Sequence, residues 1–159
     1  MNYDLLLNVI NLPVALSWLA MLVAPRWRVT RAFLHSDVVP LAIGIVYLSI
    51  AVRYVPGWFT AFRNLDSIFE FFTHRDLLFI GWIHYLAFDL FVGRSILADS
   101  QRRGIPHLLM VPCLFMTFMF GPGGYVAYAL VRLVTGKYAG PVTPLPETAA
   151  PSAAPAARP

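Results

Sequence analysis

Four long apolar stretches, joined by shorter and more polar segments, make up most of the chain. They cover residues 5–24, 38–55, 77–98 and 108–131. An α-helix rises 1.5 Å per residue, so about 20 apolar residues are needed to cross a bilayer. The second stretch is shorter, and we expect Arg53 near its end to extend its side chain toward the interface. The pattern predicts four transmembrane helices packed as an all-α bundle.

The segment between the second and third stretches mixes apolar and charged residues at largely helical spacing. Arg63, Asp66 and Glu70 lie between its apolar positions, which are Trp58, Phe59, Phe62, Leu65, Ile68, Phe69 and Phe72. A helix with one apolar and one charged face is stable in the plane of the membrane interface. We therefore expect an interfacial amphipathic helix over residues 56–76.

The last 21 residues, 139–159, have a different composition, with six prolines and seven alanines. Such a segment cannot bury a hydrophobic core, so we predict that it is disordered. Residues 1–138 then form a single membrane domain.

The composition excludes an ordinary soluble domain, because 58% of the residues are hydrophobic and only 13% are charged. The net charge of +4 comes mostly from residues at the ends of the apolar stretches, which is typical of membrane-flanking loops and argues against a nucleic-acid partner. The single cysteine, Cys113, excludes an internal disulfide and a cysteine cluster for a metal. We expect no metal and no cofactor, and membrane lipid as a partner.

The positions of the basic residues predict the orientation, because cytoplasmic loops are enriched in Lys and Arg. The first loop carries Arg26, Arg28 and Arg31, and the third carries Arg102 and Arg103. Both loops are therefore expected on the cytoplasmic side. Four crossings then place the N-terminus and the C-terminus together on the other side.

Asp89 is the most informative polar residue inside an apolar stretch. It lies 12 residues into the third stretch, about 18 Å along a helix and near the middle of the bilayer. A carboxylate there is costly unless it is paired or protonated, so such residues often serve function. His84 lies on a neighbouring helix face, about 140° away. A structural ion pair of Asp89 with Arg94 or Arg53 is the competing interpretation.

The fourth stretch contains Gly121, Pro122, Gly123 and Gly124, which we expect to kink or unwind the helix. Non-helical backbone at membrane depth is tolerated only where protein or a cavity covers it, so the break indicates a binding site. Matching of depths places the break with Asn8, Asn11, Arg53, His84, Asp89, Tyr125 and Tyr128. Helix packing alone is the competing interpretation for the glycines and for Asn8.

Aromatic residues of the third and fourth stretches predict a groove for a long apolar ligand. The third contributes Phe88 and Phe91, and the fourth contributes Phe115, Phe118, Met119 and Phe120. A helix interface without a ligand stays open as an alternative, since aromatic and methionine side chains are ordinary core material.

Three segments of this sequence resemble one known family. They are NLPVALSWLAMLVAPRWRVTR, GWIHYLAFDLFVGR and FGPGGYVAY. They are similar to the small integral membrane proteins related to plant neoxanthin synthase, the abscisic-acid-deficiency-four-like family. The resemblance covers about residues 5–138, and its specific part is the order Trp82, His84, Asp89, Phe91 and Arg94.

The resemblance implies a four-helix membrane protein of xanthophyll metabolism. Plant members are required for the conversion of violaxanthin to neoxanthin, in which an epoxide opens into an allene and a hydroxyl group. The chain lacks the long N-terminal transit region of the plastid members. We therefore expect a bacterial relative in the inner membrane.

This isomerisation needs an acid, a base and an apolar slot, and it needs no cofactor. Asp89 is the candidate acid and His84 the candidate base, while Asn11 and Tyr125 would orient the oxygen. The other expected contacts of a carotenoid-like ligand are Trp82, Tyr85, Arg94, Phe118, Gly121, Pro122 and Gly124. A non-catalytic carotenoid- or lipid-binding or assembly protein is the alternative, a transporter is a third class, and a homo-oligomer stays open.

Overall fold

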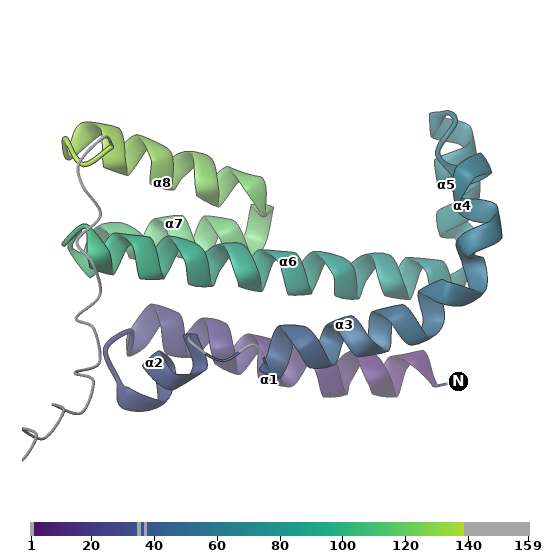
Figure 1. The fold of residues 1–159 in the computed structure, drawn as a ribbon, viewed down its shortest axis with the longest axis horizontal. Coiled ribbons are helices and arrows are strands. Elements are labelled where there is room, and N and C mark those ends of the chain that lie inside the picture. Colours follow the sequence, from purple (N-terminus) through teal and green to yellow (C-terminus); the bar gives the residue numbers. More distant parts are fainter. Residues whose placement is uncertain (1, 35, 37, 139–159) are drawn as a thin grey trace, which may run out of the picture.

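The computed structural model describes residues 2–34, 36 and 38–138, and every regular element in them is helical. The expectation of an all-α fold is therefore confirmed for this part of the chain. The expected disordered tail, residues 139–159, lies outside the described residues. Figure 1 shows the elements, which are α1 (Tyr3–Val23), α2 (Arg28–Leu34), α3 (Val38–Ala51), the short 3-10 helix η1 (Val52–Tyr54), α4 (Val55–Ala61), α5 (Leu65–Thr73), α6 (Arg75–Arg102), α7 (His107–Phe120) and α8 (Pro122–Val134).

Helix α6 is the central element of the fold. Its 28 residues extend for about 42 Å, and it packs against α1, α3 and α7. Ile83, Leu90 and Leu97 are fully buried at intervals of seven residues and anchor the core. The indole of Trp18 lies directly against Gly93, where a Cβ atom would clash with the ring. The small residue therefore allows α1 and α6 to pack closely.

Among the described residues, three helical stretches are long and apolar enough, by length and composition, to cross a membrane. They are Tyr3–Val23, Val38–Ala61 and Arg75–Arg102. Their outward side chains include exposed Leu5, Leu16 and Leu48, which water would disfavour and lipid accommodates. The fold therefore indicates membrane association.

The fourth apolar stretch does not form the expected single helix over residues 108–131. It forms two helices, α7 and α8, which fold back on each other at Gly121 (Figure 1). Gly121 adopts φ +51°, a conformation that L side chains rarely adopt. The 14 residues of α7 reach only about 21 Å, less than the roughly 30 Å of hydrocarbon. The expected fourth crossing is thus replaced by a helical hairpin, and a four-helix bundle is not confirmed.

The hairpin also changes the expected relation between the start of α1 and the residues after α8. Asp4 near the start of α1 pairs with Arg75 at the start of α6, at 2.7 Å. At the other end of α6, Lys137 donates a hydrogen bond to the carbonyl of Gly104. The start of α1 and residue 138 therefore lie at opposite ends of the long axis (Figure 1), whereas four crossings would place them on the same side.

The segment expected as one amphipathic helix over residues 56–76 contains two short helices, α4 and α5. The break follows from Asn64, whose side chain accepts a hydrogen bond from the Ser67 N–H at 2.8 Å and caps α5. Figure 1 shows both helices turned away from the axis of α6 at the N-terminal end of that helix. We call α4 and α5 together the arm.

Candidate functional site

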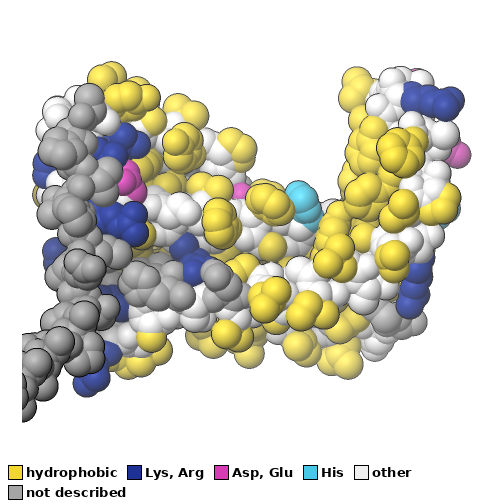
Figure 2. Space-filling model, viewed as in Figure 1, with side chains coloured by type: hydrophobic (Ala, Val, Ile, Leu, Met, Phe, Trp, Pro, Cys, Tyr) yellow, Lys and Arg dark blue, Asp and Glu magenta, His cyan; other side chains and the backbone are white. Residues whose placement is uncertain are grey.

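A hollow lies over the middle of α6, between the α7–α8 hairpin and the arm (Figure 2). Two close approaches define its limits along α6. Gly81 meets the ring of Phe72 from the arm, and a Cβ atom at Gly121 of the hairpin would contact both Tyr85 and Asp89. About two turns of α6 therefore form the floor of the hollow. In a membrane, the hollow would open sideways into lipid.

The hairpin turn brings backbone directly onto the carboxyl group of Asp89. A Cβ atom at position 121 would lie 3.0 Å from Asp89 Oδ1 and 3.5 Å from the Tyr85 ring. The Tyr85 hydroxyl donates a hydrogen bond to the Phe118 carbonyl at 3.4 Å, which fixes the ring against the end of α7. Asp89, Tyr85 and Gly121 therefore form one cluster, and the structure unites these three predicted site residues.

Asp89 is an unusual buried acid. The residue is 8% exposed, and its Oδ2 atom has no hydrogen-bond partner among residues 2–34, 36 and 38–138. Asp89 forms no ion pair with Arg94 or Arg53 in this part of the chain, which disfavours the structural interpretation. Arg94 is buried on the side of α2, with its guanidinium 5.7 Å from the centre of the Phe33 ring. Burial of a carboxyl oxygen without a hydrogen bond is costly, so the position is a candidate for function.

His84 is exposed and belongs to a different face of α6. Its ring stacks on Phe88 at 4.6 Å between centroids and lies 5.5 Å from Tyr47 of α3. No hydrogen bond joins His84 to Asp89 in the described structure, as the expected separation of about 140° requires. The two candidate catalytic groups thus flank the same stretch of α6 without touching.

Asn11 contacts Trp82 and not His84, the residue with which the matching of depths had grouped it. The indole N–H of Trp82 is 3.5 Å from Asn11 Oδ1, and its ring lies 5.8 Å from that of Tyr85. Trp82 also lines an apolar recess of about 370 Å³ between the starts of α1 and α6. A continuous row of side chains therefore leads from α1 to the hairpin turn.

The remaining predicted contacts have mainly structural positions. Gly124 lies against Thr117, so close that any Cβ atom would overlap its backbone, which supports the packing interpretation. Phe118 is half-buried with its ring 5.4 Å from that of Trp18. Pro122 begins α8, and Tyr125 is exposed on that helix. The structure does not bring Tyr125 into the cluster around Asp89.

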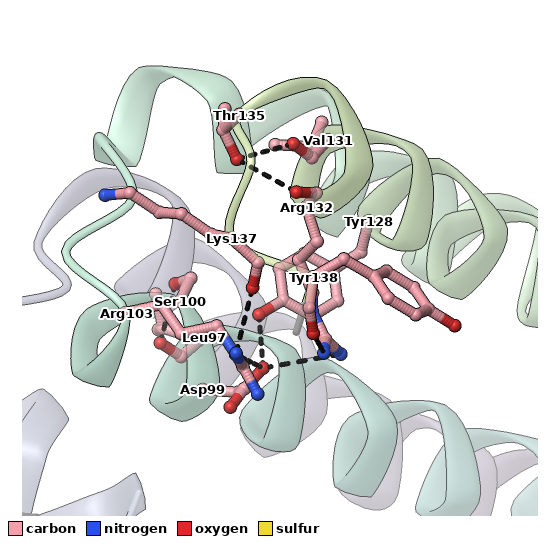
Figure 3. A network of polar contacts seen from close by, with 10 residues as sticks. All are labelled: Leu97, Asp99, Ser100, Arg103, Tyr128, Val131, Arg132, Thr135, Lys137 and Tyr138. Atoms are coloured by element: carbon pink, nitrogen blue, oxygen red, sulfur yellow. Dashed lines mark hydrogen bonds and ion pairs between the residues drawn. The ribbon is translucent and has the colours of Figure 1, made fainter. Parts of the chain in front are cut away.

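The sequence interpretation missed a polar network that holds the end of α8 to α6 (Figure 3). Asp99 Oδ2 accepts hydrogen bonds from the Tyr128 hydroxyl at 2.6 Å and from Arg103 Nε at 2.8 Å, with Arg132 3.7 Å away. The hydrogen bond to Asp99 raises the pKa of Arg103 above its ordinary value. Tyr128 was expected near the glycine break, and its hydroxyl instead joins this network in the middle of α8. The i, i+4 spacing of Asp99 and Arg103 is the signal that could have located the network.

No metal site is evident among the described residues. Within these ranges, no group of three or more His, Cys, Asp or Glu side chains could hold a metal ion. Cys113 is buried in α7.

Comparison with known proteins places the helices described above in one family. Residues 5–128 match the family model described as ABA DEFICIENT 4-like. The chain belongs to this family. It is 24% identical over 122 residues to the protein ABA DEFICIENT 4, chloroplastic, of Arabidopsis thaliana, a match that covers 72% of this chain and 54% of the relative.

The chain thus spans about half the length of that curated relative. No solved structure matches this chain. The ABA DEFICIENT 4-like region extends from α1 into α8, so it contains the cluster of Tyr85, Asp89 and Gly121 together with Asn11, Trp82 and His84.

Proposed function

We propose that this ABA DEFICIENT 4-like protein acts in carotenoid or xanthophyll metabolism as a cofactor-independent isomerase within the membrane. The observation that carries the proposal is Asp89, a buried carboxyl without a hydrogen-bond partner for Oδ2 among the described residues, at the edge of a hollow that would open into lipid. A carotenoid is long, apolar and confined to the bilayer. Its end group would reach this hollow without leaving the hydrocarbon.

The proposed reaction opens an epoxide to an allenic alcohol and leaves the atomic composition unchanged. Asp89, as the neutral acid, donates its proton to the epoxide oxygen as the C–O bond breaks. His84 removes a proton from the adjacent polyene carbon, and the electrons of that C–H bond complete the allene. The proton then returns from the imidazolium to the carboxylate before the next turnover.

The separation of the two groups supports this division of roles. His84 and Asp89 are five residues apart on α6, a rise of about 7.5 Å. They do not hydrogen-bond to each other within the described structure, so an end group lying across α6 would contact both. Phe88 and Phe91 are exposed on the same helix and offer apolar surface to a polyene.

Pigment analysis tests the catalytic proposal. The protein is produced in a bacterial host that makes an epoxy-carotenoid, and the carotenoids are separated by chromatography. We expect a new isomer with the unaltered protein, and its loss in Asp89→Asn and in His84→Gln at equal protein levels in the membrane. Asp66→Asn, an exposed carboxyl change on the arm, is the matched control and should retain activity. Unchanged product with Asp89→Asn would disprove the assigned role.

A non-catalytic pigment- or lipid-binding protein is the second candidate. The observation that favours it is the mostly apolar recess between α1 and α6, lined by Leu7, Leu78 and Trp82 among others. Pigment that follows the protein through gel filtration in unchanged chemical form would favour this candidate. A changed carotenoid profile would favour the isomerase.

A further inference from the structure

A second site, separate from the hollow, lies within the arm. A pocket of about 640 Å³ is lined by η1, α4, α5 and the start of α6. Its lining is much more polar than that of the recess beside Trp82. The residues with polar side chains include Arg53, Arg63, Asn64, Ser67, Glu70 and His74.

The position of the pocket along α6 corresponds to the head-group layer of a bilayer. Helix α6 extends for about 42 Å, which equals the hydrocarbon core of about 30 Å plus the polar layers. The pocket contacts His74 and Leu77 at the first turn of this helix. The exposed ion pair of Asp4 with Arg75 marks the same level. A ligand in the pocket would therefore lie among lipid head groups.

The charged residues of the pocket have no partners in the described part of the chain that would explain their positions. Arg53, Arg63 and Glu70 are exposed, and none of them forms an ion pair with another described residue. Two guanidinium groups suit a phosphate, since each can present two parallel N–H donors. One carboxylate suits an ammonium group. The set is thus complementary to a ligand that carries both charges.

We propose that this pocket binds the head group of a phospholipid that carries a phosphate and a primary amine. Arg53 and Arg63 bind the phosphate, and Glu70 binds the ammonium group. Phe71 and Leu77 form apolar parts of the lining, against which the acyl chains begin. The bound lipid fastens the arm to the interface, where an amphipathic helix such as α5 is stable. This inference does not depend on the proposed isomerase activity.

Native mass spectrometry of the purified full-length chain tests the proposal. The detergent-solubilised protein is incubated with equimolar phosphatidylethanolamine and phosphatidylglycerol, and the retained lipids are counted. We expect phosphatidylethanolamine to be preferred. The double variant Arg53→Gln and Arg63→Gln should retain about tenfold less of both lipids, because charge-assisted hydrogen bonds of this kind correspond to about one decade of affinity.

The variant Glu70→Gln separates the two halves of the site. It should still retain phospholipid but lose the preference for phosphatidylethanolamine over phosphatidylglycerol. The matched control is Arg28→Gln with Arg31→Gln, two exposed arginines at the opposite end of the molecule, and it should leave retention unchanged. Because all four arginines are exposed, a thermal melt should show that each variant remains folded.

Two results would overturn the proposal. Equal lipid retention by the wild type and the Arg53, Arg63 double variant would mean that the pocket does not bind phosphate. The second result concerns glycerophosphoethanolamine, a soluble molecule with the same head group and no acyl chains. If it displaced the lipid at equal concentration, the pocket would be assigned to a soluble phosphate ligand instead of a membrane lipid.

Discussion

Gly121 at the hairpin turn lies so close to Asp89 in the middle of α6 that any side chain at position 121 would crowd the carboxyl group. A Cβ atom there would lie 3.0 Å from the Asp89 carboxyl oxygen, and the backbone itself has φ +51°. The same glycine therefore reverses the direction of the chain and covers the buried acid. The turn and the candidate site depend on each other, and changes at the turn are expected to affect both.

Gly121→Ala tests this dependence. We expect a loss of about 1–2 kcal/mol from the unfavourable φ value, and a further loss from contact with Asp89. Thermal unfolding in detergent measures the total. Gly136→Ala is the matched control, because Gly136 also has positive φ (+68°) but a Cβ atom added there would have no neighbour within 4 Å. Equal losses in the two variants would mean that the contact with Asp89 contributes nothing.

The close packing of α7 and α8 at Gly124 gives a second prediction. Gly124→Ala places a methyl group in the backbone of Thr117, so the hairpin must open, at a cost of about 1–3 kcal/mol. Gly123→Ala is the control, since its nearest neighbour, Phe120 Cβ, is at an ordinary 3.5 Å. Limited proteolysis of the detergent-solubilised protein should cleave the Gly124 variant within the hairpin faster than the Gly123 variant. Identical digestion rates would contradict the packing role.

The sequence predicted the helical fold and three helical stretches long and apolar enough to cross a membrane among the described residues, because uncharged runs of about 20 residues have few alternatives in lipid. It also singled out Asp89 and the glycine break, which are conspicuous in hydrophobic sequence and which the structure brings into contact. It failed at Gly121, where it predicted a kink and the chain instead reverses. Whether a helix continues or folds back after such a break depends on what the returning helix can pack against. Here that is the contact of Gly124 with Thr117, which lies beyond local sequence patterns.

The error at the turn propagated to other expectations. A continuous helix would have carried Tyr128 away from Asp99, whereas the hairpin joins them at 2.6 Å. A continuous fourth crossing would also have placed Arg132 and Lys137 on the side of the membrane opposite the other basic loops. With the hairpin, these two residues lie at the same end of α6 as Arg103, which is the arrangement expected if the basic segments share one side of a membrane.

The hydrogen bond from Tyr128 to Asp99 is expected to stabilise the docking of α8. Tyr128→Phe removes the hydroxyl and leaves the ring, and hydrogen bonds to charged groups contribute about 1.5–3 kcal/mol. A lower unfolding temperature in detergent is the expected result. Tyr125→Phe is the control, because the Tyr125 hydroxyl is on an exposed side chain with no hydrogen bond to another described residue. A shift of equal size in both variants would argue against the role of Asp99.

The hairpin leads to a final prediction, because it gives the chain a different membrane topology from the one that a fourth crossing would give. In a Cys113→Ser background, single cysteines are introduced at Ala32 in α2, at Asn64 in the arm and at Gly136 after α8. We expect a membrane-impermeant thiol reagent to label positions 32 and 136 from one side and position 64 from the other. The basic residues around position 32 predict that the first side is cytoplasmic. If position 136 were labelled together with position 64, residues 107–134 would cross the membrane, and the close approach of Gly121 to Asp89 could not exist there. Labelling in right-side-out and inverted vesicles distinguishes these outcomes directly.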